Sequence, residues 1–274
     1  MQLTQRVAVV TGAAGGLGSA ISRRFAREGA KVVLCDINVQ VAQEIAGELN
    51  KAGADCIALR CDVSSSASVD ETFVAVDTRF GQVDILVNSA ALVPDKANDE
   101  VRRRAHYDLI TKPLPRQSLG FTSAMSDAEW KRFWAVNVDG VFYCTRAALK
   151  RMEAQQYGRI INIASIAGIS AASAHSPHYS ATKGAVVAFT RAVAAEVAGA
   201  NIRVNAIAPG GVETPAMNHF IAAMTAEQRN TLWQMVPAGR MGHPDEYAAL
   251  AAHLASEECY LVGEIVNASG GVVI

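Results

Sequence analysis

Short apolar runs rich in β-branched residues recur along the chain, and each is followed by a longer stretch of helical character. Within the runs the apolar residues are consecutive rather than alternate, which is typical of strands buried on both faces of a parallel sheet. We predict seven such strands, at Val7–Val10, Lys31–Asp36, Cys56–Asp62, Val83–Asn88, Gly158–Ala164, Ile202–Ile207 and Glu264–Asn267.

The stretches between the strands carry apolar residues at helical spacing. Val41, Ile45 and Leu49, for example, recur every four residues and form one face of a helix. We predict helices at Ser19–Glu28, Val39–Lys51, Ala67–Phe80, Ala128–Gln155, Tyr179–Ala198 and Pro244–Leu254. Because strands and helices alternate, right-handed crossovers would build an α/β fold, a doubly wound parallel sheet with helices on both faces. No repeat or linker interrupts this order, so we expect residues 1–274 to form a single domain.

Composition narrows the class of protein and of partner. Half of the residues are hydrophobic and 19% are charged, which excludes global disorder. The formal net charge is −1, so binding to nucleic acid through overall charge is excluded. The five cysteines contain no C-x-x-C pair, which predicts no metal site and favours a reduced, cytoplasmic setting. Without a signal peptide or an apolar run of about 18 residues, we expect no membrane association.

A glycine-rich segment, Thr11–Gly18, lies between the first predicted strand and the first predicted helix. Glycines here allow a tight turn and a close approach of the backbone to a pyrophosphate, which the helix N-terminus can also bind. A plain turn would have the same pattern, but Asp36 follows at the end of the second strand. A carboxylate about 20 residues beyond such glycines binds the adenine-ribose hydroxyls of a dinucleotide.

The neighbours of Asp36 indicate which dinucleotide is bound. A carboxylate repels a 2′-phosphate, and the residues beside it in the chain bring no cation to the same place. We therefore predict NAD rather than NADP as the cofactor. Asp62 and Val63, after the third strand, could bind the adenine amine and pack against its ring, although an aspartate there is also common turn chemistry.

The order of these motifs, with others further along, resembles the short-chain dehydrogenase/reductase family. The shared residues are Thr11-Gly12-x-x-x-Gly16-x-Gly18, Asn88 after the fourth strand, Asn137, Ser165, and the pair Tyr179-x-x-x-Lys183. The likeness runs from about Val7 to Gly271. The chain departs from the family at Ser89–Ala91, which replaces the usual Asn-Ala-Gly and reduces backbone freedom at Ala91.

The resemblance implies a Rossmann fold and nicotinamide-linked chemistry at the CH–OH group of a small-molecule alcohol or at the matching ketone. It implies four catalytic residues, Asn137, Ser165, Tyr179 and Lys183. It implies cofactor contacts from Gly12, Gly16, Leu17, Gly18, Asp36, Ile37, Asp62, Val63, Asn88, Ala90, Tyr179, Lys183, Pro209, Gly210, Val212 and Thr214. It also implies a homotetramer, or a homodimer, assembled through the two longest predicted helices.

The catalytic residues are of types that can move a proton while a hydride is transferred. A phenol has a reference pKa of about 10, and each unit of depression needs about 1.4 kcal/mol of stabilisation of the phenolate. Lys183 lies four residues after Tyr179, on the same helical face, and could supply that stabilisation. Ser165 could donate a hydrogen bond to the substrate oxygen, and Asn137 could hold a water that relays protons from Lys183.

We therefore expect an NAD(H)-dependent oxidoreductase that interconverts a secondary alcohol and a ketone, with Tyr179 as general acid and base. Three alternatives remain open. A 3-oxoacyl thioester reductase would be favoured by an NADP site. A non-catalytic NAD-binding sensor or scaffold would be favoured by loss of a catalytic residue, and an epimerase or dehydratase by tight retention of NAD.

Two features lie outside the family pattern. Leu92–Ser126 has no clear apolar period, and we expect an extended loop insertion near the substrate cleft, since connections beyond about 12–15 residues are usually functional or disordered. Its run Arg102–Arg104 could attract a carboxylate, a phosphate or an acyl-carrier group, but we favour a solvated, partly mobile loop. His175 and His178, before Tyr179, could line the pocket or bind a metal, but we favour partly exposed loop histidines.

Overall fold

The protein, described here from a computed structural model, forms one seven-stranded sheet. The structure describes residues 2–94 and 97–274, so Asp95 and Lys96 of the expected insertion lie outside the described residues. All strands are parallel, in the order β3-β2-β1-β4-β5-β6-β7. They are β1 Val7–Thr11, β2 Lys31–Asp36, β3 Cys56–Arg60, β4 Ile85–Asn88, β5 Gly158–Ile163, β6 Ile202–Pro209 and β7 Ile265–Ala268. The predicted doubly wound parallel sheet is confirmed.

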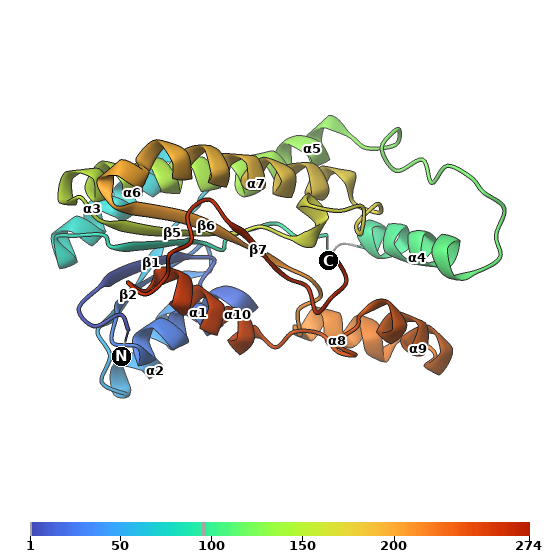
Figure 1. The fold of residues 1–274 in the computed structure, drawn as a ribbon, viewed down its shortest axis with the longest axis horizontal. Coiled ribbons are helices and arrows are strands. Elements are labelled where there is room, and N and C mark those ends of the chain that lie inside the picture. Colours follow the sequence, from blue (N-terminus) through green and yellow to red (C-terminus); the bar gives the residue numbers. More distant parts are fainter. Residues whose placement is uncertain (1, 95–96) are drawn as a thin grey trace.

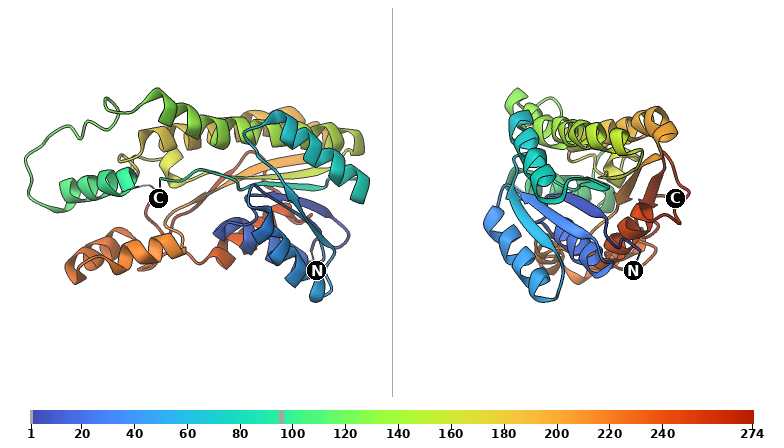
Figure 2. Two further views of the ribbon diagram at one scale, coloured as in Figure 1. Left: turned by 180° about the vertical axis from the view of Figure 1, so that it is seen from behind. Right: turned by 90° about the vertical axis from the view of Figure 1, so that its left-hand side faces the viewer.

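Helices cover both faces of this sheet, so the molecule has three layers (Figures 1 and 2). On one face lie α1, α2 and α10, at Gly16–Arg27, Val39–Lys51 and Pro244–Ala255. On the other lie α3, α6 and α7, at Ser66–Phe80, Gly140–Gln155 and Pro177–Val197. Among the described residues, none of the helices is both long and apolar enough to span a bilayer.

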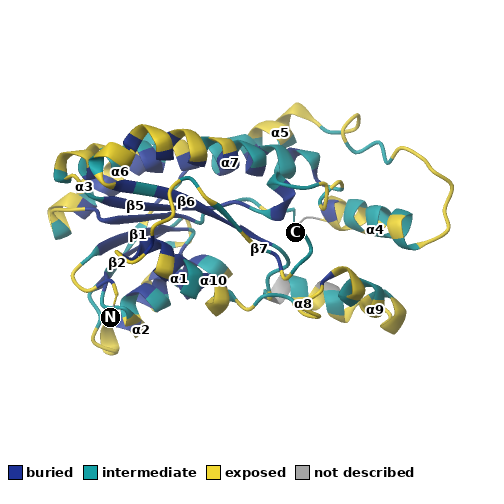
Figure 3. Ribbon diagram, viewed as in Figure 1, coloured by how far each residue is buried: buried dark blue, intermediate teal, exposed yellow. Residues whose placement is uncertain are grey.

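Burial on both faces explains the unbroken apolar runs of the strands (Figure 3). All five residues of β1 are buried. Ala8 packs in one core with Phe25 of α1, whereas its neighbour Val9 packs in the other core with Phe73 of α3. Alternate residues of one strand therefore serve two separate cores, and a polar residue at either face would be costly.

The order of the strands creates a crevice at one end of the sheet. β1 pairs with β2 on one side and with β4 on the other, so the connections that follow β1 and β4 leave toward opposite faces. Loops that separate in this way open a gap at the carboxyl ends of the strands, where doubly wound folds bind their ligands. The glycine-rich segment and the segment Ser89–Ala91 both begin at this point.

The insertion Leu92–Ser126 contains a helix, which corrects the expectation of an extended loop. Helix α4 spans Ala97–Thr111, and an irregular stretch then leads out and back to α5, Asp127–Trp134 (Figure 1). Within α4 only Asp99 is buried, because the helix lies over the crevice and not against a core. Because α4 does not pack against a core, it carries no apolar stripe. Its helical period is therefore not visible as a pattern of apolar residues in the sequence.

The long helix expected at Ala128–Gln155 is interrupted by a π-helical segment, η1, at Ala135–Asp139. The segment buries Asn137 completely. π-Segments of this kind occur often at functional sites, because they turn one side chain away from the regular helical register. The remaining elements are the short helices η2 Ile166–Gly168, η3 Ala198–Ala200, α8 Pro215–Ala222 and α9 Ala226–Met235. The sequence patterns did not predict α8 or α9.

Candidate active site

A cavity of about 950 Å³ occupies the crevice. Its floor is formed by loops that follow β1, β4, β5 and β6, and its roof by α4 on one side and α8 with α9 on the other. The volume is typical of a site for a small molecule and part of a cofactor. Eleven of the residues expected in catalysis or cofactor binding line it: Gly12, Gly16, Leu17, Gly18, Ser165, Tyr179, Lys183, Pro209, Gly210, Val212 and Thr214. Asp36 lies outside this wall and is bonded to Ala14 of the glycine-rich segment.

The glycine-rich segment brings the backbone of two loops into contact. Gly12 has a φ of +67°, and a Cβ on it would lie 2.7 Å from the backbone of Ala90. A Cβ on Gly18 would lie 2.1 Å from the carbonyl oxygen of Gly12, so neither position accepts a side chain. No side chain caps the N-terminus of α1, and its first turn carries no acidic residue. The N–H groups there are therefore suited to the phosphates of a dinucleotide.

Asp36 is held against this segment at the end of β2. Its Oδ2 accepts a hydrogen bond from the backbone N–H of Ala14 at 2.9 Å, and its Oδ1 accepts one from Asn38 at 2.8 Å. Each oxygen keeps a second lone pair for a ribose hydroxyl. Arg60, which is exposed, stands opposite Asp36 in the register between β2 and β3. The sequence neighbours of Asp36 gave no sign of this cation, because it comes from the adjacent strand.

Besides Asp36, several expected cofactor residues lie outside the cavity wall. They are Ile37, Asp62, Val63, Asn88 and Ala90. Asp62 accepts hydrogen bonds from the N–H and the Oγ of Ser64, at 3.0 and 2.6 Å, which is the turn chemistry weighed as its alternative role. Asn88 is buried, and its Nδ2 donates to Thr145 Oγ1 and to Asn162 Oδ1. The side chain of Asn88 is therefore used for hydrogen bonds inside the protein, and a contact with a cofactor at this point would have to come from neighbouring residues.

Ser165, Tyr179 and Lys183 meet at the cavity. Ser165 follows β5 and caps η2, where its Oγ accepts a hydrogen bond from the N–H of Ala167 at 3.1 Å. Tyr179 and Lys183 stand one turn apart in α7, and Lys183 Nζ lies 5.7 Å from the centroid of the Tyr179 ring. Lys183 Nζ donates to the carbonyl oxygen of Ile163 at 2.7 Å, so the last residue of β5 fixes the ammonium group.

Burial acts on both titratable groups of this set. It raises the pKa of the Tyr179 phenol, while the hydrogen bond with Ser165 lowers it. Burial also lowers the pKa of Lys183 to about 8. In the protein alone, desolvation therefore decides the direction of the shift, and the opposing effect on the pKa of Tyr179 comes from Ser165 and not from Lys183 as expected. A protonated phenol at neutral pH is ready to donate its proton, whereas accepting one requires further stabilisation of the phenolate.

Asn137 lies behind the cavity wall and anchors the beginning of the insertion. Its Oδ1 accepts from the N–H of Leu92 at 2.7 Å, and its Nδ2 donates to the Leu92 carbonyl at 3.0 Å and to Thr182 Oγ1 at 3.2 Å. Both amide hydrogens are therefore used. This geometry joins the π-segment, the insertion and α7 at one residue. The water relay expected of Asn137 stays a prediction.

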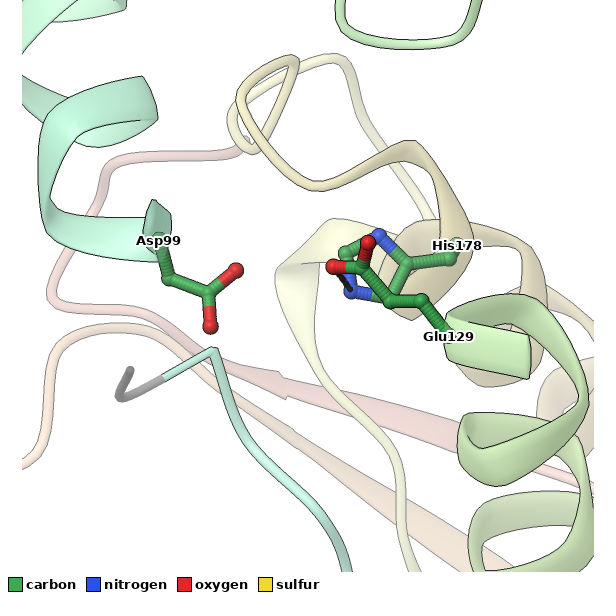
Figure 4. A group of neighbouring side chains, drawn as sticks. All are labelled: Asp99, Glu129 and His178. Atoms are coloured by element: carbon green, nitrogen blue, oxygen red, sulfur yellow. Dashed lines mark ion pairs between the residues drawn. The ribbon is translucent and has the colours of Figure 1, made fainter. Parts of the chain in front are cut away.

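A network of charged groups fastens α4 to the body of the protein. Arg102 donates to both carboxylate oxygens of Glu129 in α5, at 2.7 and 3.2 Å, and its Nη1 lies 3.6 Å from Asp99. Glu129 in turn lies 3.7 Å from Nε2 of His178, and Figure 4 shows Asp99 pointing toward this pair. Carboxylates and a histidine also bind divalent cations, but here the guanidinium of Arg102 already neutralises Glu129.

His178 is not the partly exposed loop residue that we expected. It is fully buried in the first turn of α7, next to Tyr179, and its ring meets the edge of Phe133 at a centroid distance of 4.2 Å. Burial lowers its pKa, so it is neutral at pH 7. His175, by contrast, is a partly exposed loop residue, as we favoured, and it also lines the cavity.

One face of α4 forms the roof of the cavity, and most of that roof was missed from the sequence. Arg103, His106, Tyr107 and Ile110 line the cavity at helical spacing. Tyr107 also donates from its hydroxyl to the carbonyl oxygen of Gln228 at 2.6 Å, which links α4 to α9 across the opening. A periodic search for apolar residues does not find a face on which arginine, histidine and tyrosine alternate.

Comparisons with known proteins agree with this geometry. Residues 6–225 match the family model described as short chain dehydrogenase. Cis-4-hydroxycyclohexanecarboxylate dehydrogenase of Sinomonas cyclohexanicum is 35% identical over 268 residues, which cover 97% of this chain and 96% of that protein. The 3-oxoacyl-acyl-carrier-protein reductase FabG of Vibrio cholerae is 34% identical over 273 residues, 99% of each chain. A solved structure from Agrobacterium tumefaciens superposes with a TM-score of 0.85 at 30% identity, over 100% of this chain and 98% of that one.

Proposed function

The chain belongs to the short-chain dehydrogenase family, an oxidoreductase family, and we propose that it is an NAD(H)-dependent enzyme that interconverts a secondary alcohol and a ketone. The observation that carries the proposal is the convergence of Ser165, Tyr179 and Lys183 on a cavity that begins at the glycine-rich segment. All four residues expected in catalysis are present, which argues against a non-catalytic sensor or scaffold.

The cofactor site fits NAD at both ends. The uncapped N-terminus of α1 would bind the pyrophosphate, and Asp36 would accept hydrogen bonds from the adenine ribose. Near the catalytic residues, Lys183 would hold the nicotinamide ribose, and Thr214 the carboxamide. NAD, when bound, supplies the acceptor or donor of the hydride.

The chain's own residues manage the proton. In alcohol oxidation Tyr179 takes the proton of the substrate hydroxyl, and in ketone reduction it returns that proton to the oxygen. Ser165 donates a hydrogen bond to the same oxygen and stabilises its developing charge. The ammonium group of Lys183 favours the phenolate form of Tyr179, which burial alone disfavours. Oxidation should therefore accelerate, and reduction slow, as the pH rises above neutrality.

The names of two relatives support different substrates. The Sinomonas protein is named for a cyclic secondary alcohol that carries a carboxylate, which agrees with our proposal. The Vibrio protein is named as a reductase of 3-oxoacyl groups on acyl-carrier protein, which keeps a 3-oxoacyl thioester reductase as the second candidate. Asp36 argues against the second candidate, because a carboxylate at the ribose disfavours NADP.

The proposal is tested by nicotinamide absorbance at fixed protein concentration. NAD and NADP are each combined with secondary alcohols, diols, hydroxy acids and sterols, and NADPH is combined with an acetoacetyl thioester. We expect NAD-linked oxidation of at least one alcohol and little turnover with NADP. Equal rates with NADP would overturn the role of Asp36, and selective NADPH-linked reduction of the thioester would establish the second candidate.

We further propose a cytoplasmic homotetramer that assembles through α6 and α7. Phe142 on α6 is 42% exposed, and its ring lies 6.4 Å from that of Phe189 on α7, so an apolar group crosses the outer faces of both helices. Such a group is typical of an interface between subunits. Light scattering of the purified protein measures the assembly, and a monomeric mass would contradict it.

A further inference from the structure

Two histidines face each other in the wall of the cavity, and we call them the histidine pair. His106 comes from α4 and His175 from the loop before α7, and their ring centroids lie 5.7 Å apart. Both residues line the cavity that also contains Tyr179. Neither ring takes part in the proton transfer assigned to Tyr179 and Ser165, so the pair is free for a different task at the same site.

The ring nitrogens of the histidine pair are not used within the protein. In the part of the chain that the structure describes, neither ring makes a hydrogen bond with another residue, and Nδ1 of His175 is the one nitrogen of the pair that is buried. The other nitrogens belong to side chains that line the cavity and are not buried. A neutral imidazole has one donor and one acceptor, so the pair can both donate and accept hydrogen bonds.

The charges around the histidine pair balance. Burial lowers the pKa of His106, and burial followed by Arg103 lowers that of His175 to about 4, so both rings are neutral at pH 7. Glu100 and Arg103 of α4 line the same cavity with opposite charges. Glu100 lies 3.4 Å from another arginine of α4, and Arg103 donates to a main-chain carbonyl oxygen at 2.6 Å. The wall around the pair therefore favours neither an anion nor a cation.

The side of the cavity formed by α8, α9 and the turn between them is largely apolar. It contributes the side chains of Met217, Met224, Leu232 and Met235. Methionine side chains adapt to apolar bodies of different shape, but they cannot replace the hydrogen bonds of water. A ligand that fills the cavity displaces water from the histidine pair, and ring nitrogens left without a partner weaken binding. The ligand therefore needs a polar group at this point.

We propose that the histidine pair binds a second hydroxyl group of the substrate, while Tyr179 acts on the hydroxyl group that is oxidised. The substrate class is thus a diol with an apolar body between its two hydroxyl groups. A hydroxyl donates and accepts, which matches two neutral rings, whereas a carboxylate only accepts and its charge is opposed by Glu100. This inference rests on the proposed function, because it names the substrate class of the same site.

The test is a binding experiment without turnover, because an alcohol cannot pass a hydride to a cofactor that is already reduced. Calorimetry uses NADH or NADPH, whichever the protein binds more tightly. It compares two diols of different length, cyclohexane-1,4-diol and bicyclohexyl-4,4′-diol, each with the alcohol in which a methyl group replaces the second hydroxyl. We expect at least one diol to bind ~10-fold more tightly than its methyl analogue, beyond the roughly twofold advantage of two equivalent ends.

Variants assign this preference to the histidine pair. His106→Phe and His175→Phe keep a ring without its nitrogens, and each should remove most of the preference. His175→Gln, whose amide can bond near the position of Nε2, should keep part of it. His219→Phe is the matched control, since His219 lines the cavity from α8 and is exposed, and it should leave the preference unchanged. An unchanged Kd for the cofactor shows that each variant is folded.

Each outcome decides the proposal. No preference in either diol series, or a preference that survives both phenylalanine variants of the pair or is lost in His219→Phe instead, would overturn it. Tighter binding of 4-hydroxycyclohexanecarboxylate than of either diol would replace the hydroxyl with a carboxylate and so contradict the assignment. If the preference is found but no alcohol is oxidised with NAD, the subsite stands and the proposed function fails. If alcohols are oxidised but diols bind no better than their methyl analogues, the function stands and the subsite fails.

Discussion

The two ends of the cavity are built on different principles. At the end formed by the sheet, Ser165 and Lys183 are fixed by backbone groups at the end of β5 and just after it. Ser165 accepts a hydrogen bond from the N–H of Ala167, and Lys183 donates one to the carbonyl oxygen of Ile163. At the end formed by α4, the roof is held by side-chain contacts, chiefly Arg102 with Glu129. Backbone contacts tolerate little substitution, whereas side-chain contacts can be exchanged singly. We infer that the chemistry is fixed at the sheet and the choice of substrate at α4.

The strongest way to break this division is Tyr179→Phe, which removes the proton carrier and keeps the ring. We expect turnover to fall by ~10³-fold, within the range for general acid–base catalysis, while the Kd for NAD changes little. Steady-state kinetics and fluorescence titration measure the two effects. Tyr107→Phe, on the opposite side of the cavity, is the matched control and should alter KM far more than kcat. Similar losses of kcat in both variants would show that the two ends are not separate.

Lys183→Met tests whether the buried ammonium group at the sheet end of the cavity lowers the stability of the folded protein. Burial lowers the pKa of Lys183 from 10.5 to about 8, so at pH 7 the folded protein holds a desolvated charge. Removing it should raise the free energy of unfolding by ~1–3 kcal/mol at pH 7, although activity is lost. Urea unfolding measures the change.

The difference in free energy of unfolding between Lys183→Met and the wild-type protein should depend on pH, and the direction of that dependence follows from the lowered pKa of Lys183. Between about pH 8 and 10.5 the folded wild-type protein has released the proton of Lys183, whereas the unfolded chain retains it. This group's contribution therefore makes the wild-type protein more stable as the pH rises through that window. The gap between Lys183→Met and wild type should narrow there. A gap that stays constant, or a variant less stable at pH 7, would contradict a buried ammonium.

Asp36→Ala tests, within the cofactor site, whether Asp36 sets the preference for NAD over NADP. The substitution removes the acceptor for the ribose and the charge that repels a 2′-phosphate, and it leaves Arg60 on the neighbouring strand. We expect the preference for NAD over NADP to fall by ~10–100-fold, as the loss of charge-assisted hydrogen bonds implies. Dissociation constants for both cofactors measure it. Adding Arg60→Ala should reverse part of the gain for NADP, and an unchanged preference in the single variant would remove Asp36 from this role.

The smallest effect is expected from Arg102→Met, which loosens the roof without touching the cavity. The contact with Glu129 is part-buried and contributes on the order of 1 kcal/mol to holding α4 in place. Its loss should therefore raise the KM for substrate by ~3–10-fold. We expect kcat and the Kd for NAD to stay within about twofold of the wild-type values. Arg104→Met, whose partner Glu100 is exposed, is the control and should change neither constant. A loss confined to kcat would place Arg102 in the chemistry and not in the roof.

The same contrast explains what the sequence could predict. The seven strands were visible because the inner strands are buried on both faces and the edge strands β3 and β7 still carry short apolar runs, and the doubly wound sheet follows from their alternation with helices. The glycine-rich segment and the Tyr179–Lys183 pair were visible because a short local spacing defines each. Asp36 belongs with them, since its place depends only on the end of one strand.

The residues of α4 that form the roof of the cavity could not be predicted from the sequence, for a physical reason. The helical repeat of α4 consists of residues that face a ligand cavity, so Arg103 and Tyr107 stand where a core helix would carry leucine. The burial of His178 could not be inferred either, because Phe133 and Glu129, which enclose it, are distant in the chain. The π-segment that turns Asn137 inward depends on packing between α5, α6 and α7, and no local residue pattern announces it.

The most direct measurement of the central claim follows the hydride itself. A secondary alcohol that the enzyme oxidises is labelled with deuterium at its hydroxyl-bearing carbon, and the reduced cofactor is analysed by mass spectrometry. The account predicts NADH that carries one deuterium in every turnover of the wild-type protein, and formation of the same product ~10³-fold more slowly by Tyr179→Phe. Reduced cofactor without deuterium, or labelled product formed by the variant at the wild-type rate, would contradict hydride transfer governed by Tyr179.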